Sequence, residues 1–328
     1  MKAVWYEKQG AASEVLQFGQ VDIPQPGTNE VRVRVAVSGV NPVDTKRRLG
    51  GRGDMPAQRI IPHLDGAGVI DLVGPGVDDA RLGERVWVYE AQGARPFGTA
   101  AQWVTVPTHC AVPLPDNTSF AAGAALGVPA LTAHACVFAE SDEIAGKTLL
   151  VTGGAGAVGR YAVQFAKLSG AQVIATVSNT EKAQLAASAG ADHVLNYRTD
   201  DVAARVQEIT ANQGVDQIVE VEFGGNLDTS LQVLRPGGVI ATYASQAVPE
   251  PKIPFYTLLY QHVVVRHILV LLMPNDKKQQ AVTEISRWLE EDKITHHLGQ
   301  RFALEQTIAA HEAVENAAVG KVLIEIKD

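Results

Sequence analysis

Cysteine is scarce in this chain, whose 328 residues include only Cys110 and Cys136. Two cysteines far apart in the sequence cannot build a disulfide framework, so we expect two free thiols in a reducing compartment, by default the cytoplasm. Long apolar runs are also missing, and the N-terminal sequence MKAVWYEKQG has no signal-peptide core. The sequence therefore predicts neither a membrane span nor a secreted disulfide scaffold.

An excess of positive charge is absent as well. The formal net charge of −8 at pH 7 argues against a protein that binds nucleic acid through a basic surface, although a local basic patch is compatible with it. The composition, 46% hydrophobic and 20% charged, is that of an ordinary globular chain. The length favours two domains over one, and there are no internal repeats or low-complexity segments.

The rest of the sequence is organised around the stretch 148–170. The apolar run Leu149–Val151 ends in a glycine cluster in which Gly154, Gly156 and Gly159 match G-x-G-x-x-G, and a helical pattern follows directly. Such a match alone commonly marks only a structural turn. Here a strand precedes it and a helix and a second strand follow, which is the context of a dinucleotide-binding fingerprint. We therefore predict a nucleotide site.

Each of these glycines has a mechanical reason in such a site. We expect Gly154 to allow the tight turn out of the strand and Gly156 to let the backbone approach a pyrophosphate with no Cβ in the way. Gly159 would let the helix pack closely on the strand. The helix N-terminus then offers N–H groups and a positive dipole end to the phosphates.

The pattern of secondary structure changes near residue 119. Before it, short alternating segments separated by Gly, Pro and Asp turns predict an all-β barrel or sandwich, interrupted by a helix near Val43–Leu49. After it, strands alternate with helices, which predicts a parallel, doubly wound sheet of six strands. The segment after residue 271 is assigned back to the first domain. The expected domains are thus residues 1–120 with 272–328, and residues 121–271.

The last strand of the parallel sheet is expected over His262–Leu271. Its nearly unbroken apolar run, Val263–Leu271, fits a strand that is covered on both faces. It also fits a sheet edge that pairs with a second subunit, so both interpretations stay open.

The end of the second parallel strand bears on which nucleotide is bound. In NAD sites an Asp or Glu near this position binds the ribose 2′-hydroxyl, whereas here the sequence is Ser178-Asn179-Thr180 with no acid. Lys182 and Tyr197-Arg198 follow, which favours NADPH over NADH because a hydroxyl, an amide and a cation accept a 2′-phosphate. The alternative for Lys182 is a solvated helix residue.

Several motifs together resemble the medium-chain dehydrogenase/reductase superfamily and, within it, the zinc-free quinone oxidoreductases that are similar to zeta-crystallin. The motifs are Ser38-Gly39-Val40-Asn41-Pro42-Val43-Asp44-Thr45, Asp65-Gly66-Ala67-Gly68-Val69, Gly83-Glu84-Arg85-Val86, Gly127-Val128-Pro129, the glycine stretch, Gly190-Ala191-Asp192 and Asn196-Tyr197-Arg198. The resemblance implies an α/β fold, in which a six-stranded Rossmann sheet accompanies a β-rich GroES-like domain.

The resemblance also explains why no metal is expected. Zinc-dependent members of the superfamily carry a catalytic Cys where this chain has Asn41, and a His–Glu pair where it has Leu64-Asp65. Leucine cannot ligate zinc, and two cysteines cannot build the four-cysteine structural lobe of those members. His63 lies next to the lost ligand position and is interpreted as structural.

Without a metal, the family resemblance implies hydride transfer from NADPH to a quinone or an enone-like C=C. Asn41 is the candidate catalytic residue, as a donor to developing negative charge, with a plain turn Asn before Pro42 as the alternative. Asp44 is interpreted as a helix N-cap. By family analogy the cofactor-binding residues are Gly154, Ala155, Gly156, Ala157, Val158, Gly159, Ser178, Lys182, Tyr197, Ser245, Ile268, Leu269 and Val270.

Two segments depart from the family pattern. Lys46-Arg47-Arg48 and Arg52 stand where many relatives have tyrosines, and a solvated surface is favoured over a cluster that selects an anionic acceptor. Glu220 and Glu222 lie in an atypical segment near the expected nicotinamide ribose.

The leading expectation for function is an NADPH-dependent quinone or enone reductase that acts on a small molecule. The alternatives are a 2-alkenal or 2-enoyl thioester reductase and a low-turnover NADPH-binding structural or regulatory protein. The resemblance further implies a homodimer that pairs through Val263–Leu271. The acidic net charge argues against a nucleic-acid partner.

Overall fold

The computed structural model describes residues 1–327, so Asp328, the last residue of the first expected domain, lies outside the described residues. The chain separates into two compact units. Unit 1 comprises residues 1–128 and the segment from 282 onward, and unit 2 comprises residues 129–281. Both divisions fall inside helices, α4 (Gly127–Val137) and α10 (Asn275–Glu290). The finer domain boundaries expected from the sequence stay a prediction.

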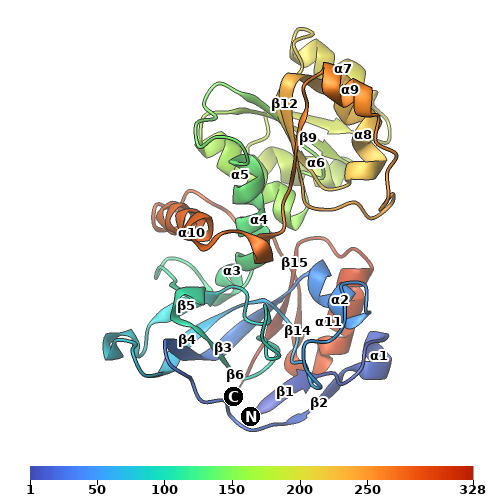
Figure 1. Ribbon diagram of the computed structural model, residues 1–328. Helices are drawn as coiled ribbons and strands as arrows, with labels where there is room; N and C mark the ends of the chain where they lie inside the picture. Colours follow the sequence, from blue (N-terminus) through green and yellow to red (C-terminus); the bar gives the residue numbers. More distant parts are fainter. Residues whose placement is uncertain (328) are drawn as a thin grey trace. The chain divides into compact units, whose positions relative to one another are not determined.

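Unit 1 is organised on a seven-stranded, mostly antiparallel sheet of order β14-β15-β3-β4-β5-β7, with β6 paired to β3 (Figure 1). A separate pair, β1 and β2, is antiparallel. The strands are β1 (Lys2–Trp5), β2 (Gln17–Gln20), β3 (Glu30–Val40), β4 (Asp65–Val73), β5 (Arg85–Val88), β6 (Trp103–Pro107), β7 (Ala111–Pro113), β14 (Leu298–Ala303) and β15 (Lys321–Glu325). The helices are α1 (Ala12–Val15), α2 (Pro42–Arg48), α3 (Phe120–Gly123) and α11 (Thr307–Glu315), with short 3₁₀ turns η1 (Asp79–Arg81), η2 (Thr108–Cys110) and η4 (Leu304–Gln306).

Strand β3 is the centre of this sheet. Its alternating sequence places Val31, Val33 and Val35 in the core, as the period-2 pattern predicted. The strand continues to Val40, beyond the predicted segment, because β4 and β15 both pair with its second half. Val322 of β15 lies opposite Val40, so the C-terminal segment completes the sheet begun by the N-terminal half of the chain (blue and red in Figure 1).

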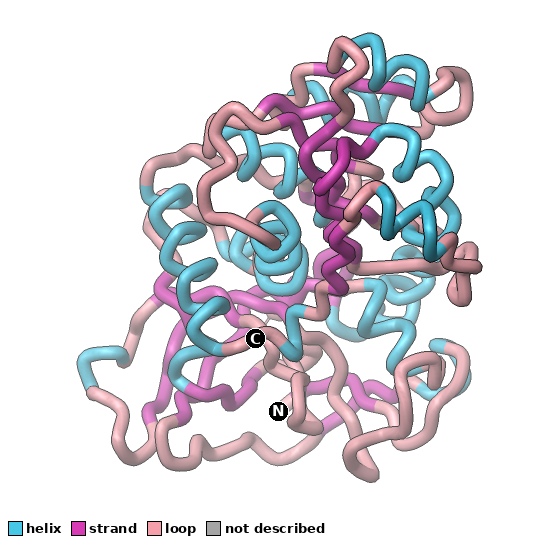
Figure 2. Tube along the Cα trace, turned by 45° about the horizontal axis from the view of Figure 1, so that its top comes forward, coloured by secondary structure: helices cyan, strands magenta, loops and turns pink. Residues whose placement is uncertain are grey.

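Unit 2 is a six-stranded sheet, all parallel, of order β10-β9-β8-β11-β12-β13, with helices on both faces (Figure 2). This confirms the predicted α/β fold with a doubly wound sheet. The strands are β8 (Thr148–Val151), β9 (Gln172–Val177), β10 (His193–Asn196), β11 (Val215–Glu220), β12 (Leu234–Thr242) and β13 (Val264–His267). The helices besides α4 and α10 are α5 (Ala157–Leu168), α6 (Thr180–Ser188), α7 (Val202–Ile209), α8 (Phe223–Val233) and α9 (Phe255–Tyr260), with the 3₁₀ turn η3 (Val270–Leu272).

The last strand differs from its prediction. Strand β13 covers only Val264–His267, pairs only with β12, and contains half-buried or exposed residues, so it is a sheet edge and is not covered on both faces. The remainder of the apolar run turns away as η3, in which Val270 is buried and Leu272 is largely exposed. The apolar run was longer than the strand because it supplies both the edge strand and the following turn.

Three further differences have local causes. Pro236-Gly237-Gly238 has the sequence of a turn but lies within β12, where the register against β11 shifts; Pro236 and Gly237 are exposed and Gly238 is buried. The helical sequence pattern from Leu304 to Asn316 divides into the 3₁₀ turn η4 and helix α11. The sequence pattern missed strand β14, whose residues are half-buried or exposed and so lack an apolar run, and it missed α9, which has no buried residue.

Cys110 and Cys136 are both free and buried, as expected. Among residues 1–327, no helix combines the length and the apolar character needed to cross a membrane.

Candidate active site

The glycine cluster forms the turn from β8 into α5 in unit 2. The left-handed backbone conformation in this turn falls on Gly153, with φ of 66°, one residue before the first glycine of the fingerprint. Gly154 is required by packing instead, since a Cβ there would lie 2.7 Å from the Cβ of Ala175. A Cβ on Gly159 would lie 2.3 Å from the Gly153 oxygen, so helix α5 packs directly on the turn.

The start of α5 has the form that a pyrophosphate requires. Gly156 is the N-cap residue, no side chain caps the helix, and both Gly156 and Ala157 are exposed. The N–H groups of the first turn therefore face outward with no intrahelical acceptor. A Cβ on Gly156 would meet only the Gly153 oxygen, at 3.2 Å, so the outer side of the turn is open. The residues present fit a dinucleotide phosphate.

The residues predicted to hold the adenosine end lie at the same edge of the sheet. Asn196 pairs with Val177 in the β9–β10 register, and the Tyr197 N–H donates to the Val177 oxygen at 3.0 Å. Ser178 and Tyr197 therefore follow neighbouring strands side by side. The Asn179 side chain caps α6 by accepting a hydrogen bond from the Lys182 N–H at 2.9 Å, and Lys182 is half-buried.

Ser245 and the segment Ile268–Val270 follow β12 and β13 at this same carboxyl edge. The Ser245 hydroxyl accepts from the Gly224 N–H at 2.9 Å and donates to the Val248 oxygen at 2.5 Å, so it organises its own loop. The Ile268 N–H donates to the Thr242 oxygen at 2.8 Å, and Leu269 beside it is exposed.

Glu222 binds the backbone of the loop that contains Ser245. Its carboxylate accepts three backbone hydrogen bonds, from the N–H groups of Gln246 at 2.7 Å, Ala247 at 3.0 Å and Val248 at 3.2 Å. These bonds and a further one from the Gly225 backbone lower the pKa of Glu222. The Glu222 carboxylate thus binds a cluster of backbone N–H groups in the way that a bound anion would. The sequence had offered no signal for this role, because the loop lies more than 20 residues away.

Glu220 is buried at the end of β11. Its carboxylate accepts from the Thr152 hydroxyl at 2.8 Å, the Asn226 amide at 2.9 Å and the Glu222 N–H at 2.6 Å. Burial raises the pKa of Glu220 despite these bonds. Because Thr152 immediately precedes the glycine turn, Glu220 ties that turn to the start of α8.

In unit 1, Asn41 lies in a buried polar cluster. It is the N-cap residue of α2 and is 2% exposed, but its side chain does not cap the helix. Instead the Asn41 amide nitrogen donates to Asp65 Oδ2 at 2.7 Å, and Lys321 Nζ donates to Asn41 Oδ1 at 2.5 Å. Lys321 also pairs with Asp65 Oδ2 at 3.0 Å. This lysine was not identified from the sequence, since a lone Lys at the start of an apolar strand is ordinarily solvated.

Two glycines make room for this cluster. Asp65 Oδ1 accepts from the Val128 N–H at 2.9 Å, and a Cβ on Gly127 would lie 2.0 Å from that oxygen. A Cβ on Gly39 would lie 2.7 Å from Lys321 Cε. Both glycines belong to motifs that carried the family resemblance. These close approaches explain why each position requires a glycine.

Asp44 is the third residue of α2, not its N-cap as expected. Its Oδ2 accepts from the Asn41 backbone N–H at 2.7 Å, while its own N–H donates to the Asn41 backbone oxygen at 3.0 Å. Burial and the nearby Asp65 carboxylate raise the pKa of Asp44 to about 7.

His63 belongs to a buried hydrogen-bond chain whose direction the geometry fixes. Thr99 must donate to the Asp65 backbone oxygen (2.5 Å), so Ser38 must donate to Thr99 (2.7 Å) and must accept from His63 Nδ1 (2.9 Å). Burial lowers the pKa of His63 to about 3, so its Nε2 is unprotonated and accepts from His311 Nε2 at 2.9 Å. The chain ends on a backbone carbonyl, which cannot pass on a proton, and this supports the structural interpretation of His63.

The basic segment of α2 is internally paired. Arg48 is fully buried, donates to the Gly10 oxygen at 3.0 Å and forms an ion pair with Glu315. Arg47 donates to the backbone and side-chain oxygens of Gln92, at 2.6 and 2.9 Å. The expected solvated surface is therefore wrong for Arg48, whose position is decided by α11, far away in the sequence.

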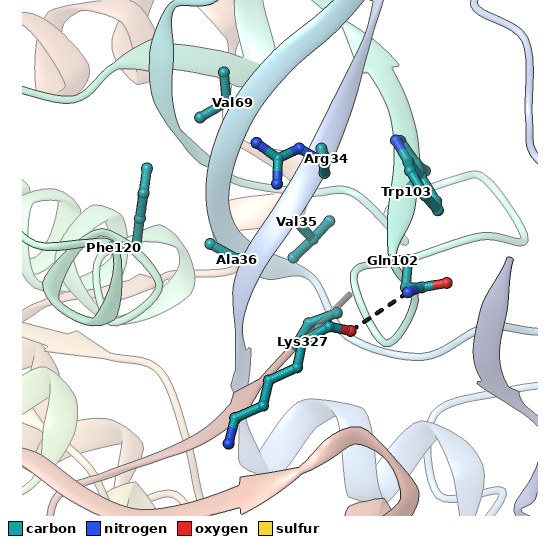
Figure 3. Close-up of a pocket in the computed structure, with 9 residues that line it drawn as sticks. Arg34, Val35, Ala36, Val69, Gln102, Trp103, Phe120 and Lys327 are labelled. Carbon is teal, nitrogen blue, oxygen red and sulfur yellow. Dashed lines mark hydrogen bonds between the residues drawn. The ribbon is translucent and has the colours of Figure 1, made fainter.

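A cavity of about 330 Å³ lies elsewhere in unit 1, beside β3 (Figure 3). Gln102 and Lys327 are joined across its rim by a 3.4 Å hydrogen bond. Its lining residues are Arg34, Val35, Ala36, Val69, Gln102, Trp103, Phe120, Ile326 and Lys327, and none of them is a predicted site residue. Within residues 1–327, no three His, Cys, Asp or Glu side chains are grouped closely enough to hold a metal ion.

Comparison with known proteins identifies the family. Residues 27–116 match the alcohol dehydrogenase GroES-like domain, and residues 157–287 match the zinc-binding dehydrogenase family. A quinone oxidoreductase of Pseudomonas aeruginosa is 31% identical over 303 residues, which is 91% of each chain. The chain belongs to the medium-chain dehydrogenase/reductase superfamily, among its quinone oxidoreductase-like members. It is an oxidoreductase of this group, and the GroES-like assignment of the first domain is confirmed.

Two further similarities bear on chemistry. The chain is 33% identical over 259 residues to a 2-haloacrylate reductase of a Burkholderia species, which covers 76% of this chain and 75% of that protein. An Escherichia coli quinone oxidoreductase solved in complex with NADPH has a TM-score of 0.87 and 26% identity, and the match covers 99% of this chain and all of that one. That relative therefore binds a nicotinamide cofactor.

Proposed function

We propose that this protein is an NADPH-dependent reductase that transfers hydride to a quinone or an enone-type acceptor without a metal. The observation that carries the proposal is the open glycine turn and uncapped start of α5, which share one sheet edge with Ser178, Lys182 and Tyr197. No acid stands at the end of β9, so the adenosine end suits a 2′-phosphate. The E. coli relative bound to NADPH supports the same cofactor.

The chemistry of the Asn41 cluster supports catalysis without zinc. The positions that supply Cys and His in zinc-dependent members hold Asn41 and Leu64, which give zinc no thiolate or imidazole. The remaining acid, Asp65, is already neutralised by the Lys321 ammonium and accepts three hydrogen bonds. A cation at this carboxylate would have to displace a buried lysine.

In the proposed reaction, bound NADPH supplies the hydride, and a proton from solvent completes the reduced acceptor. The protein contributes binding and orientation: the turn Ala155–Val158 and the first turn of α5 hold the pyrophosphate. Ser178, Lys182 and Tyr197 would hold the 2′-phosphate, and the backbone of Ile268–Val270 would bind the nicotinamide amide. Asn41 donates a hydrogen bond to the acceptor oxygen as it gains negative charge.

The test is NADPH oxidation, with NADH in parallel, against 9,10-phenanthrenequinone and a 2-alkenal. Fast turnover that requires NADPH and the quinone is expected. NADPH binding without turnover on any acceptor would instead favour the low-turnover binding protein.

A second candidate function is reduction of an activated C=C in a 2-alkenal, a 2-enoyl thioester or a 2-haloacrylate. It is favoured by the similarity to the Burkholderia reductase. Higher kcat/KM on these acceptors than on the quinone would select it, with the same cofactor and the same Asn41 role.

The open edge of β13 supports a homodimer formed by pairing of that strand with a second copy. Light scattering that shows a monomer at micromolar concentration would contradict this part of the proposal.

A further inference from the structure

The proposed reaction does not yet use Lys321, a member of the Asn41 cluster. It begins β15, is 4% exposed, and reaches Asn41 and Asp65 from positions 280 and 256 residues away in the sequence. A lysine ammonium is rarely buried unless it is paired, so its position is set by these two contacts.

The contacts of Lys321 fix the orientation of the Asn41 amide. An ammonium can only donate and an ionised carboxylate can only accept, so an amide that contacts both has a single orientation. Its oxygen faces Lys321 at 2.5 Å and its nitrogen faces Asp65 at 2.7 Å. One N–H of the amide is used by Asp65, and the second has no acceptor among the described residues.

The contact from Lys321 strengthens that second N–H as a donor. The positively charged Lys321 ammonium, bound to the amide oxygen, draws electron density away from the amide nitrogen. Hydrogen bonds in a buried chain polarise one another in this way. The backbone N–H of Asn41 is held separately by Asp44, so the main chain that carries the amide is also fixed. A donor that is already oriented and polarised needs no reorganisation when negative charge develops beside it.

We propose that Lys321 is a positioning residue for the reduction: with Asp65, it holds the Asn41 amide so that its second N–H donates to the acceptor oxygen. The inference rests on the proposed function, in which Asn41 is that donor. The competing explanation is that Lys321 only joins β15 to β4 through its ion pair with Asp65.

A double-mutant cycle in quinone reduction separates the two explanations. The variants are Lys321→Met, Asn41→Ala and the two combined, with the exposed Lys327→Met as a matched control. We expect Lys321→Met to lower kcat about 10-fold or more, short of the roughly 100-fold or greater loss that follows removal of a donor to an oxyanion. In the Asn41→Ala background, Lys321→Met should then have little additional effect on kcat, because it acts through Asn41.

Two further measurements distinguish the positioning role of Lys321 from a purely structural one. NADPH affinity, measured by fluorescence titration, should change less than about twofold in Lys321→Met, since no cofactor contact is assigned to it. The side-chain ¹H–¹⁵N resonances of Asn41 should shift in Lys321→Met and also when the hydroquinone product is added to the wild type. If Lys321→Met does not fold, Lys321→Arg, which keeps a cationic donor, should retain most activity and leave the Asn41 amide resonances near their wild-type positions.

The outcomes distinguish the inference from the proposed function. A wild-type protein that reduces quinones but gives additive effects in the cycle, or an unchanged kcat in Lys321→Met, overturns the role of Lys321 alone. A wild-type protein that binds NADPH and reduces no acceptor overturns the proposed function.

Discussion

The carboxylate of Asp44 accepts a hydrogen bond from the backbone N–H of Asn41 at 2.7 Å, while its other oxygen is buried with no hydrogen-bond partner among the described residues. The pair thus combines a helix-capping contact with a strongly desolvated acid. A buried carboxylate with one unsatisfied oxygen favours its protonated form.

Asp44→Asn should remove a pH dependence of stability. Burial and Asp65 raise the pKa of Asp44 from 3.8 to about 7, so the folded protein binds a proton more tightly than the unfolded chain. Its contribution to stability is therefore fully present below about pH 4 and declines as the pH rises to 7, by on the order of 4 kcal/mol. Urea unfolding of wild type and variant between pH 4 and 8 tests this. Parallel stability curves would contradict the assignment.

The histidine pair should remain neutral well below pH 6. Burial lowers the pKa of His63 to about 3 and that of His311 well below its usual range. The unfolded chain binds protons first, so this contribution to stability is lost as the pH falls through 6.5, opposite in sign to that of Asp44. Long-range ¹H–¹⁵N spectra should show His63 protonated at Nδ1 and His311 at Nε2. Titration of either ring near pH 6.5 would show that the buried chain is misassigned.

Asn179→Asp should shift the cofactor preference toward NADH. An Asp can replace Asn as the cap of α6, so the fold is retained while a carboxylate is placed at the end of β9. We expect it to repel a 2′-phosphate and accept a hydrogen bond from a ribose hydroxyl, which should lower kcat/KM for NADPH about tenfold or more. The ratio of kcat/KM for the two nucleotides is the measurement. Asn179→Ser, a neutral cap, is the control and should leave that ratio nearly unchanged.

Glu222→Gln should loosen the loop that contains Ser245. The substitution keeps one acceptor oxygen but removes the charge that three backbone N–H groups share, which should cost about 1–2 kcal/mol. Because the pKa of Glu222 is lowered in the folded state, its contribution is present above about pH 4.5 and lost below it. Hydrogen exchange at Gln246–Val248 should become faster, while Glu250→Gln in the same loop should leave it unchanged. Equal protection in all three proteins would exclude the proposed contact.

The glycine stretch, the alternation of strands and helices and the motif order determined the fold class from the sequence alone. These features are local: a tight turn needs glycine at fixed offsets, and a helix or strand needs its apolar residues at a fixed period. Val31–Val35 and Gly156–Gly159 were interpretable for this reason. The position of left-handed φ at Gly153, one residue before the first glycine of the fingerprint, shows that the pattern predicts the turn better than the conformation of each residue in it.

Only the tertiary structure decided the roles of charged residues. The sequence pattern showed no partner for Lys321, Arg48 or Glu222, because a charge has no period and its partner can be anywhere in the chain. Folding brings Lys321 to Asn41 across 280 residues and Arg48 to Glu315 across 267, and burial then turns these pairs into fixed structural elements. The sequence by itself determined the scaffold and the nucleotide turn, while the long-range pairing of buried charges determined how Asn41 is held.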